Sequence, residues 1–301
     1  STKNPFQKLP TPFDQINCLK LKMYIQASRL ISRYGRLKTT KGIGFVRSLS
    51  TTTQSPNGLV ETKIEDGKNV ATLILNRPPV NSLSLEMCSD ISSAIKQIEA
   101  NKKVQAVVLT SSNPAILSAG LDLTELYNPD KERLPKFWES FQQLFLDLYG
   151  SRLAVIGAIE GHAPAAGCML AMACDYRIMA SSDGDGGGDK NKRGTIGLNE
   201  AQFGIAAPPW LGQLMIRTIG FRKGEEALTL GTLFSPEDAL SIGLVDKLVE
   251  GDAVVDASYE VARTFTKIPP QARFASKMLA RKEFLDDLVE NRDTDTAHFC
   301  N

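Results

Sequence analysis

The stretch IEGHAPAAGCMLAMACD, residues 159–175, decides the fold of this chain. The apolar, β-branched run that leads into it, 154–159, predicts a buried strand, and the run 167–174 is apolar on every side, which predicts a buried helix. Small residues fill the turn between these elements: Gly161, Ala163, Pro164, Ala165 and Ala166. Backbone N–H groups at the start of such a helix can approach a ligand closely. The motif alone leaves two interpretations open, tight helix–strand packing without a ligand or an oxyanion or phosphate site.

A second strand, turn and helix follows the same plan earlier in the chain. Residues 104–110 predict a buried strand, and LSAGLDL at 117–123 predicts a glycine-containing turn that enters a helix. Asp122 falls in the first turn of that helix, where a carboxylate suits the helix dipole. Because ligands gather at the carboxyl ends of strands in strand–helix repeats, we expect both turns at one place, with two N–H donors for one oxygen.

One carboxylate stands out among apolar neighbours. Glu200 lies in TIGLNEAQFGI, residues 195–205, which is followed by AAPPWL. An acid in this setting is either a strand-end glutamate that faces water or a buried acid with a raised pKa. The residues alone do not decide between the two.

The other elements follow from periodicity and turn residues. Residues 59–65 and 70–76 predict a hairpin, Ser84 caps a helix that runs to about Ala100, and 136–148 predicts an amphipathic helix that packs. A strand at 176–180 precedes SSDGDGGGDKNKR at 181–193, which predicts a surface loop. The tail predicts a short strand at 244–249 among helices at 223–230, 235–242, 253–266 and 270–289.

Charge is divided unevenly along the 301 residues. Residues 1–58 hold ten Lys or Arg and one acid, Asp14, whereas the rest holds 25 basic and 33 acidic residues. An acidic body is a poor binder of nucleic-acid backbones.

The cysteines and histidines indicate neither a metal site nor a nucleophile. The five cysteines are scattered without CxxC spacing, which favours free thiols over a zinc site. His162 has no evident nucleophile partner, so we expect a structural role for it. No apolar run reaches the roughly 18–20 residues of a membrane span.

The basic arm is typical of a mitochondrial presequence. Residues 1–57 are rich in Ser, Thr and Arg, and Ile25, Leu30, Ile31 and Tyr34 can share one helical face. The alternative is a disordered or nucleic-acid-binding arm. We exclude 1–57 from the fold, and we expect a core at 58–250 and a C-terminal helical region at 251–301.

Several of these stretches together resemble the crotonase, or enoyl-CoA hydratase/isomerase, superfamily. The resemblance spans about 59–292 and rests on NRPPVNSLS (76–84), SAGLDL (118–123), GCMLAMACDYRI (167–178) and IGLNEAQFGI (196–205). It implies an α/β fold, a ββα superhelix of repeated strand–turn–helix units with a C-terminal helical region. It also implies a homotrimer in the mitochondrial matrix that acts on acyl-CoA substrates and binds no nucleic acid.

The resemblance also implies roles for particular residues. The N–H groups of Leu121 and Ala166 would form an oxyanion hole for the thioester carbonyl, although Ala166 stands where the family usually has Gly. Glu200 would be the catalytic base. The expected substrate-binding residues are Ala119, Gly120, Leu121, Asp122, Leu123, Ala166 and Asn199.

The pattern favours the isomerase branch of this superfamily. The hydratase branch uses two glutamates to activate water, and the first would fall at Met169, which has no carboxylate. We therefore expect a shift of a 3-enoyl-CoA double bond to trans-2-enoyl-CoA in β-oxidation, with no metal and no cofactor besides the coenzyme A of the substrate. The alternatives are a hydratase, a thioester hydrolase, or a non-catalytic homologue that binds acyl-CoA or RNA.

Overall fold

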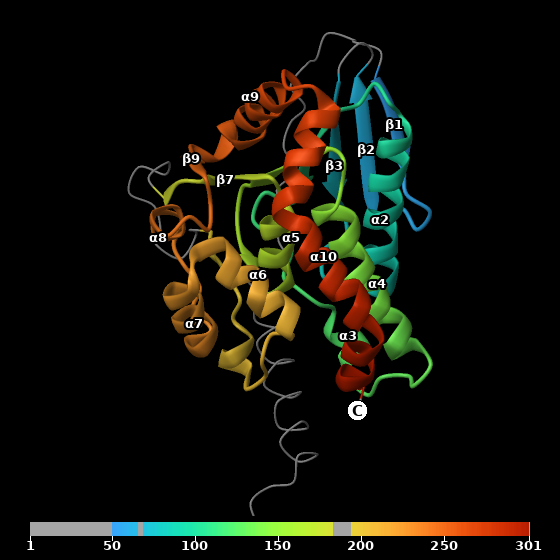
Figure 1. The fold of residues 1–301 in the computed structure, drawn as a ribbon, viewed down its shortest axis with the longest axis vertical. Coiled ribbons are helices and arrows are strands. Elements are labelled where there is room, and N and C mark those ends of the chain that lie inside the picture. Colours follow the sequence, from blue (N-terminus) through green and yellow to red (C-terminus); the bar gives the residue numbers. More distant parts are fainter. Residues whose placement is uncertain (1–49, 66–68, 183–193, 301) are drawn as a thin grey trace, which may run out of the picture.

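A seven-stranded mixed sheet forms the centre of the computed structural model, which describes residues 50–65, 69–182 and 194–300 (Figure 1). The strands lie in the order β1-β2-β3-β4-β5-β7-β9. Their bounds are β1 Ser50–Gln54, β2 Val60–Glu65, β3 Val70–Leu75, β4 Ala106–Ser111, β5 Ala154–Ile159, β7 Tyr176–Ala180 and β9 Lys247–Val249. Strand β2 pairs antiparallel with β1 and with β3, and every later pair in the order is parallel.

The first strand corrects the expected start of the fold. Residues 1–57 were excluded from it, yet β1 pairs with β2 from Ser50 opposite Glu65 to Gln54 opposite Glu61. The segment is polar and most of its side chains are exposed, because an edge strand is held by backbone hydrogen bonds and needs no apolar face. The presequence prediction for 1–49 lies outside the described residues.

Both faces of the sheet are covered. Along β4, Val107 and Leu109 belong to a large core with α2 (Leu85–Ala100), α4 (Arg133–Tyr149) and α5 (Ala166–Ala173), whereas Ala106 and Val108 belong to a smaller core under α9 (Val254–Thr266). This alternation follows from the two-residue period of a strand. The predicted repetition of strand, turn and helix with a helical C-terminal region is confirmed.

Sequence features account for the start of α2 and for the buried face of α4. Ser84 caps α2 by accepting a hydrogen bond from the Met87 N–H, as predicted. The apolar face predicted for 136–148 is buried in α4. The remaining elements are α3 Leu123–Leu126, β6 Ala163–Pro164, β8 Ile196–Gly197, the 3-10 helix η3 Glu200–Phe203, α6 Pro209–Ile219, α7 Phe221–Leu230, α8 Pro236–Ser241 and the 3-10 helix η4 Gly251–Ala253. Most of the predicted 181–193 loop lies outside the described residues.

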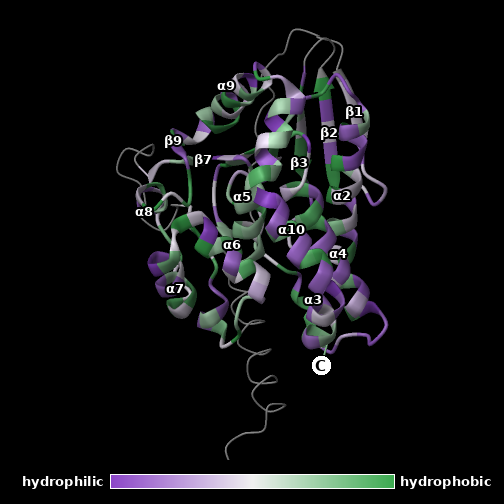
Figure 2. Ribbon diagram, viewed as in Figure 1, coloured by the Kyte–Doolittle hydropathy of each residue, from purple (hydrophilic) through white to green (hydrophobic). Residues whose placement is uncertain are grey.

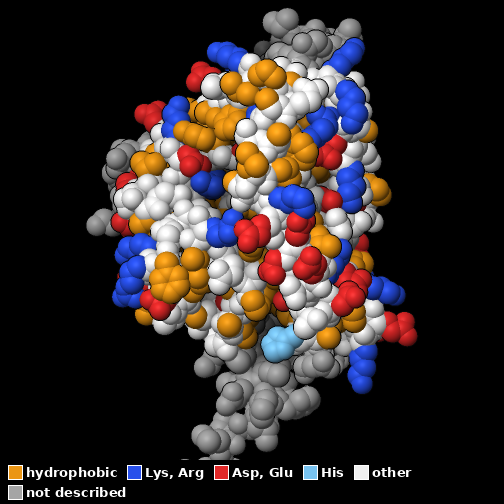
Figure 3. All heavy atoms as spheres, in the orientation of Figure 1, with side chains coloured by type: hydrophobic (Ala, Val, Ile, Leu, Met, Phe, Trp, Pro, Cys, Tyr) orange, Lys and Arg blue, Asp and Glu red, His pale blue; other side chains and the backbone are white. Residues whose placement is uncertain are grey.

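The last helix, α10 (Pro270–Cys300), runs past α4 toward the C-terminus (Figure 1). It is longer than the predicted 270–289 because the Trp138 ring stacks on Phe299 at 3.5 Å and the Trp138 indole N–H donates to Asp295. Its outer side is largely hydrophilic (Figure 2), and acidic and basic side chains are interspersed over this face (Figure 3). None of the helices in the described ranges combines the length and apolarity that a bilayer crossing requires.

Candidate active site at the ends of the parallel strands

The first predicted turn, Ser118–Asp122, is named here the Gly120 turn. Gly120 has φ +96°, a conformation that side chains rarely adopt. The N–H groups of Ala119, Gly120 and Asp122 donate to the Val80 carbonyl, the Ser118 hydroxyl and the Leu83 carbonyl, in that order. Within the described residues the Leu121 N–H donates to no protein acceptor. The donor that the family resemblance implies for this turn is therefore unused.

The second predicted turn, Ala163–Gly167, is named here the Ala166 turn. Ala165 has φ +51°, which costs free energy for any residue with a Cβ. It is held there because its N–H donates to the Gly197 carbonyl at 2.8 Å and its own carbonyl accepts from Cys168 and Met169. The Ala166 N–H, at the start of α5, has no protein acceptor among the described residues. The predicted second donor is thus also unused.

The two turns lie against each other. A Cβ at Gly120 would lie 2.9 Å from the Cβ of Ala165 and 3.2 Å from the backbone nitrogen of Ala166. A Cβ at Gly167 would lie 2.2 Å from the Ser118 carbonyl oxygen. Both positions favour glycine, because a Cβ at Gly120 would meet Ala165 and Ala166 and a Cβ at Gly167 would meet the Ser118 backbone. The expectation that both turns meet at one place is confirmed.

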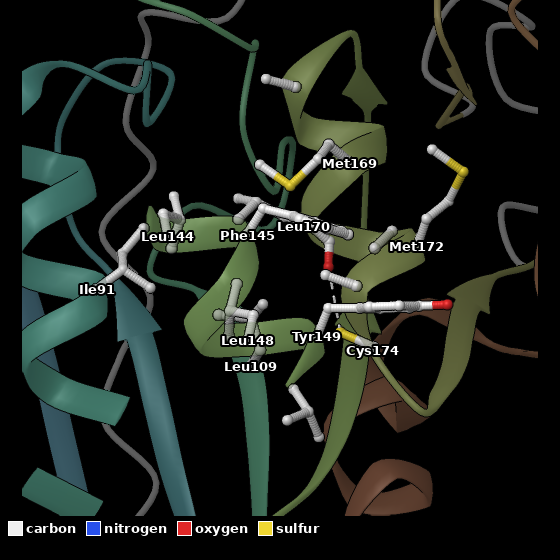
Figure 4. Packing of buried hydrophobic residues seen from close by; sticks show 14 of the residues in the cluster. Ile91, Leu109, Leu144, Phe145, Leu148, Tyr149, Met169, Leu170, Met172 and Cys174 are labelled. Carbon is white, nitrogen blue, oxygen red and sulfur yellow. Dashed lines mark hydrogen bonds between the residues drawn. The ribbon is translucent and has the colours of Figure 1, made fainter. Parts of the chain in front are cut away.

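The α5 helix that carries the Ala166 turn is buried on every side, as its sequence predicted. Figure 4 shows Met169, Leu170 and Met172 of α5 among side chains of α4 that include Leu144 and Phe145. The Cys174 thiol donates to the Leu170 carbonyl at the end of this helix. A helix held this firmly fixes the position of the N–H groups at its start.

Glu200 opens η3 next to these turns. Strand β6 of the Ala166 turn pairs with β8, Pro164 opposite Gly197, so the chain reaches Glu200 three residues later. Burial raises the pKa of Glu200 to about 7, and its Oε2 atom has no hydrogen-bond partner among the described residues. Glu200 is half-buried as a residue but its Oε2 atom is fully buried, which favours the buried-acid interpretation over the water-facing one. After burial, the Glu200 charge is the next factor that raises the pKa of the Cys168 thiol, so the carboxylate lies within electrostatic reach of α5.

The other predicted site residues lie in or next to the Gly120 turn and the segment around Glu200. Asn199 is 7% exposed and precedes Glu200, and its Oδ1 atom has no partner in the described part of the chain. Asp122 caps α3 by accepting from the Thr124 N–H, and it forms an ion pair with Arg77 at 2.5 Å. Burial raises the pKa of Asp122, but the hydrogen bonds from Thr124 and the Arg77 charge hold it below its ordinary value. Ala119 lies within the Gly120 turn, and Leu123 follows the turn as the first residue of α3.

Sequence reasoning missed how the loop Arg77–Ser84 holds the site. Asn81 in this loop is 2% exposed, and its side chain bonds to residues as far along the chain as Leu117. The available sequence signal was Asn81 itself, a polar residue shortly after two prolines, but such a stretch predicts only a turn.

His162 lies beside the site and pairs with Thr195. Its Nδ1 atom is 3.0 Å from the Thr195 hydroxyl oxygen and 3.1 Å from the Thr195 backbone nitrogen. These contacts tie the two segments together, which agrees with the structural role expected for this residue. Cys88, Cys168, Cys174 and Cys300 are free thiols, as predicted, whereas Cys18 lies outside the described residues. In the described ranges no group of three or more His, Cys, Asp or Glu side chains is arranged to hold a metal ion.

Comparisons with known proteins show the family to which the chain belongs. The sequence profile of the enoyl-CoA hydratase/isomerase family matches residues 65–301. A mitochondrial enoyl-CoA delta isomerase 1 of Mus musculus is 42% identical over 243 residues, which cover 81% of this chain and 80% of that protein. The crystal structure of human mitochondrial delta3-delta2-enoyl-CoA isomerase superposes with a TM-score of 0.75 at 39% identity, covering 80% of this chain and 90% of that chain. A mitochondrial methylglutaconyl-CoA hydratase of Rattus norvegicus is 27% identical over 230 residues, 75% of this chain and 70% of that protein.

Proposed function

Because the chain belongs to the enoyl-CoA hydratase/isomerase family, we infer that it is an enoyl-CoA isomerase, which converts a 3-enoyl-CoA into a 2-enoyl-CoA. This reaction belongs to fatty acid metabolism. The observation that carries the proposal is the pairing of one carboxylate with a buried, unpartnered oxygen, Glu200, with two unused backbone donors, Leu121 and Ala166, in adjoining segments.

We propose that the two backbone donors stabilise negative charge on the substrate. The N–H groups of Leu121 and Ala166 would both donate to the thioester oxygen. When a proton leaves C2, the electron pair spreads over a dienolate whose charge rests largely on this oxygen. Donors fixed in place before the reaction stabilise such charge without reorganisation, and one such donor typically contributes about 10²- to 10³-fold in rate.

Glu200 would carry the proton. As a carboxylate it takes the proton from C2, and as a carboxylic acid it returns a proton to C4, so the double bond moves from C3–C4 to C2–C3. A base works best when its pKa lies near the working pH, and burial places the pKa of Glu200 at about 7. The substrate gains and loses one proton and no electrons. We therefore propose that no cofactor beyond the coenzyme A of the substrate takes part.

One carboxylate suits isomerisation better than hydration. Hydration needs a second group to hold and activate water, and Met169, where the family resemblance places the first glutamate of hydratases, is a fully buried thioether. Leu170 and Ala171, which follow it on α5, are also buried and apolar.

The absorbance of the conjugated 2-enoyl thioester tests this function. Purified protein is mixed with a 3-enoyl-CoA, and separately with the 2-enoyl-CoA product. An isomerase raises the absorbance of the first solution and leaves that of the second unchanged. Loss of absorbance in the second solution would identify a hydratase, and free thiol in either would identify a thioester hydrolase. No change in either solution, with acyl-CoA still bound, would identify a binding protein.

The named relatives are mitochondrial, which points to the mitochondrion as the location of this chain. We propose the matrix as the compartment, β-oxidation of unsaturated fatty acids as the process and the basic arm as the import signal. Import of the full chain into isolated mitochondria, with resistance to added protease after the outer membrane is opened, tests the compartment.

We also propose that the chain forms a homotrimer, as the family resemblance implies. A single light-scattering peak at three times the 32.8 kDa chain mass tests this assembly. A monomer mass would contradict it.

A further inference from the structure

The loop Arg77–Ser84 lies alongside the Gly120 turn and is hydrogen-bonded to it. The Ala119 N–H donates to the Val80 carbonyl at 2.9 Å, and the Leu83 N–H donates to the Gly120 carbonyl at 2.8 Å. Leu83 and Leu121 form a parallel bridge. The position of the Leu121 N–H is therefore set by a loop about 40 residues earlier in the chain, and not only by its own turn.

Asn81 is the centre of this loop. Its Oδ1 atom accepts from the Arg77 N–H at 2.7 Å, and its Nδ2 atom donates to the Ser111 hydroxyl at 2.7 Å and to the Leu117 carbonyl at 3.0 Å. The side chain thus joins the loop to the end of β4 and to the residue before the Gly120 turn. Asn81 has φ +49°, a conformation that asparagine tolerates better than most residues.

Ser118 carries the connection into the turn. Its hydroxyl donates to the Asn81 carbonyl at 2.7 Å and accepts from the Gly120 N–H at 3.2 Å, and the side chain is fully buried. The Ser118 carbonyl packs against Gly167 at the start of α5. One residue therefore links the loop, the turn that holds the Leu121 donor and the turn that holds the Ala166 donor.

From these contacts we propose that Asn81 and Ser118 are positioning residues of the isomerase reaction, which set the distance and direction of the Leu121 N–H relative to the Ala166 N–H. The proposal rests on the function proposed above. Neither side chain needs to touch the substrate. The reason is geometric: a backbone donor that shifts by about 1 Å from the developing oxyanion loses much of its effect, and such displacements cost up to about 100-fold in rate.

Two variants test the proposal. Ser118→Ala removes one hydroxyl without changing the packing volume much. Asn81→Asp keeps the Oδ1 acceptor for the Arg77 N–H, but it loses both donor bonds and turns a carboxylate oxygen toward the Leu117 carbonyl. In each variant we expect kcat to fall about 10- to 100-fold. KM, and the dissociation constant of a saturated acyl-CoA, should stay within a few-fold, because the charge on the oxygen is small in the ground state.

Asn113→Asp is the matched control. Asn113 makes the same kind of side-chain bond to the same loop, from Nδ2 to the Pro79 carbonyl at 3.0 Å, but it does not reach the Gly120 turn. Its kcat should stay within about twofold of wild type. Rates are expressed per folded protein, with the folded fraction taken from thermal melts monitored by circular dichroism.

Each outcome decides the proposal. A lower kcat at unchanged KM in Ser118→Ala or Asn81→Asp, with Asn113→Asp active, supports it. Wild-type kcat per folded molecule in both variants overturns it, because the two residues then serve stability alone. A rise in KM with unchanged kcat also overturns it, since it indicates a role in binding. Absence of activity in the wild-type protein would contradict the proposed function itself, which is a different result.

Discussion

A Cβ at Gly120 would lie 3.2 Å from the backbone nitrogen of Ala166, so the turn that holds one proposed oxyanion donor touches the residue that holds the other. The two turns meet here through backbone atoms and the small side chain of Ala165. Close packing of the two turns therefore limits how far the donors can move apart, and the side-chain bonds of Asn81 and Ser118 act on the same turn.

This contact predicts the effect of Gly120→Ala. The new methyl group would meet both Ala165 and Ala166, and φ +96° adds backbone strain. We expect kcat to fall at least 10-fold through displacement of the donors. Gly243→Ala is the control, because Gly243 also has a positive φ, +77°, but a Cβ there meets nothing within 4 Å. That variant should lose stability, by about 1 kcal/mol, and keep its kcat. Equal kcat values for the two variants would contradict the role of the contact.

The raised pKa of Glu200 predicts a pH dependence of the rate. The carboxylate is the active form in the first proton transfer, and burial places its pKa at about 7. In the free enzyme, kcat/KM should rise about tenfold per pH unit below this value and level off above it. Initial rates between pH 5 and 9 give the profile. A profile without an inflection, or with one near the ordinary glutamate value of 4.5, would show that another group or an exposed carboxylate is the base.

The same burial predicts that Glu200 destabilises the folded protein at neutral pH. Its folded-state pKa of about 7 exceeds the ordinary 4.5, so between these values the folded state holds a proton that the unfolded state has released. The free energy of unfolding from this group therefore falls as pH rises from 4.5 to 7 and stays low above that range. Glu200→Gln removes the effect.

Urea denaturation of Glu200→Gln at several pH values measures this effect. Relative to wild type, the variant should gain stability between pH 5 and 8, by an amount on the order of 3 kcal/mol. Glu283→Gln, on the exposed side of α10, controls for the loss of one carboxylate and should change stability by less than about 0.5 kcal/mol. A gain that is independent of pH would show that the pKa of Glu200 is not raised in the folded protein.

A largely buried cluster of ion pairs joins α10 to Asp175, and it predicts the effect of removing that carboxylate. Asp175, two residues after the end of α5, accepts from the Val155 N–H and pairs with Lys277 at 2.8 Å and with Arg281 at 3.1 Å. Burial lowers the pKa of Lys277 to about 8, and the Asp175 charge opposes this shift. Asp175→Asn leaves two buried cations without their carboxylate, so we expect a loss of about 3–5 kcal/mol.

The control for this prediction lies on the same helix. Asp286→Asn breaks the exposed pair with Lys282 and should cost at most about 0.5 kcal/mol. Equal losses for Asp175→Asn and Asp286→Asn in urea denaturation would show that the buried cluster contributes no more than a surface pair.

The sequence predicted those parts of the fold whose cause is local. The strands at 70–75 and 154–159 and the helix at 166–173 follow from apolar runs, and the helix that Ser84 caps follows from its capping residue. The two turns of the site were visible because small residues followed buried strands. Glu200 was visible as a lone acid among apolar residues, but whether it was buried depended on tertiary packing.

What the sequence did not predict depends on contacts between distant residues. The strand at 50–54 is polar and forms because β2 offers it backbone partners. The helix α10 extends beyond Val289 because Phe299 stacks on the Trp138 ring. The role of Asn81 lies in bonds to residues 30 and 36 positions away, Ser111 and Leu117, which no local pattern reveals.

The role of Glu200 as proton carrier is tested most directly by comparing wild type with Glu200→Gln in the isomerisation of a 3-enoyl-CoA. The glutamine keeps the size of the side chain and cannot take the C2 proton. We expect the absorbance of the conjugated thioester to rise with wild type, and the rate with the variant to be at least about 10²-fold lower while a saturated acyl-CoA binds within a few-fold. A variant that isomerises the substrate at the wild-type rate would contradict Glu200 as the proton carrier.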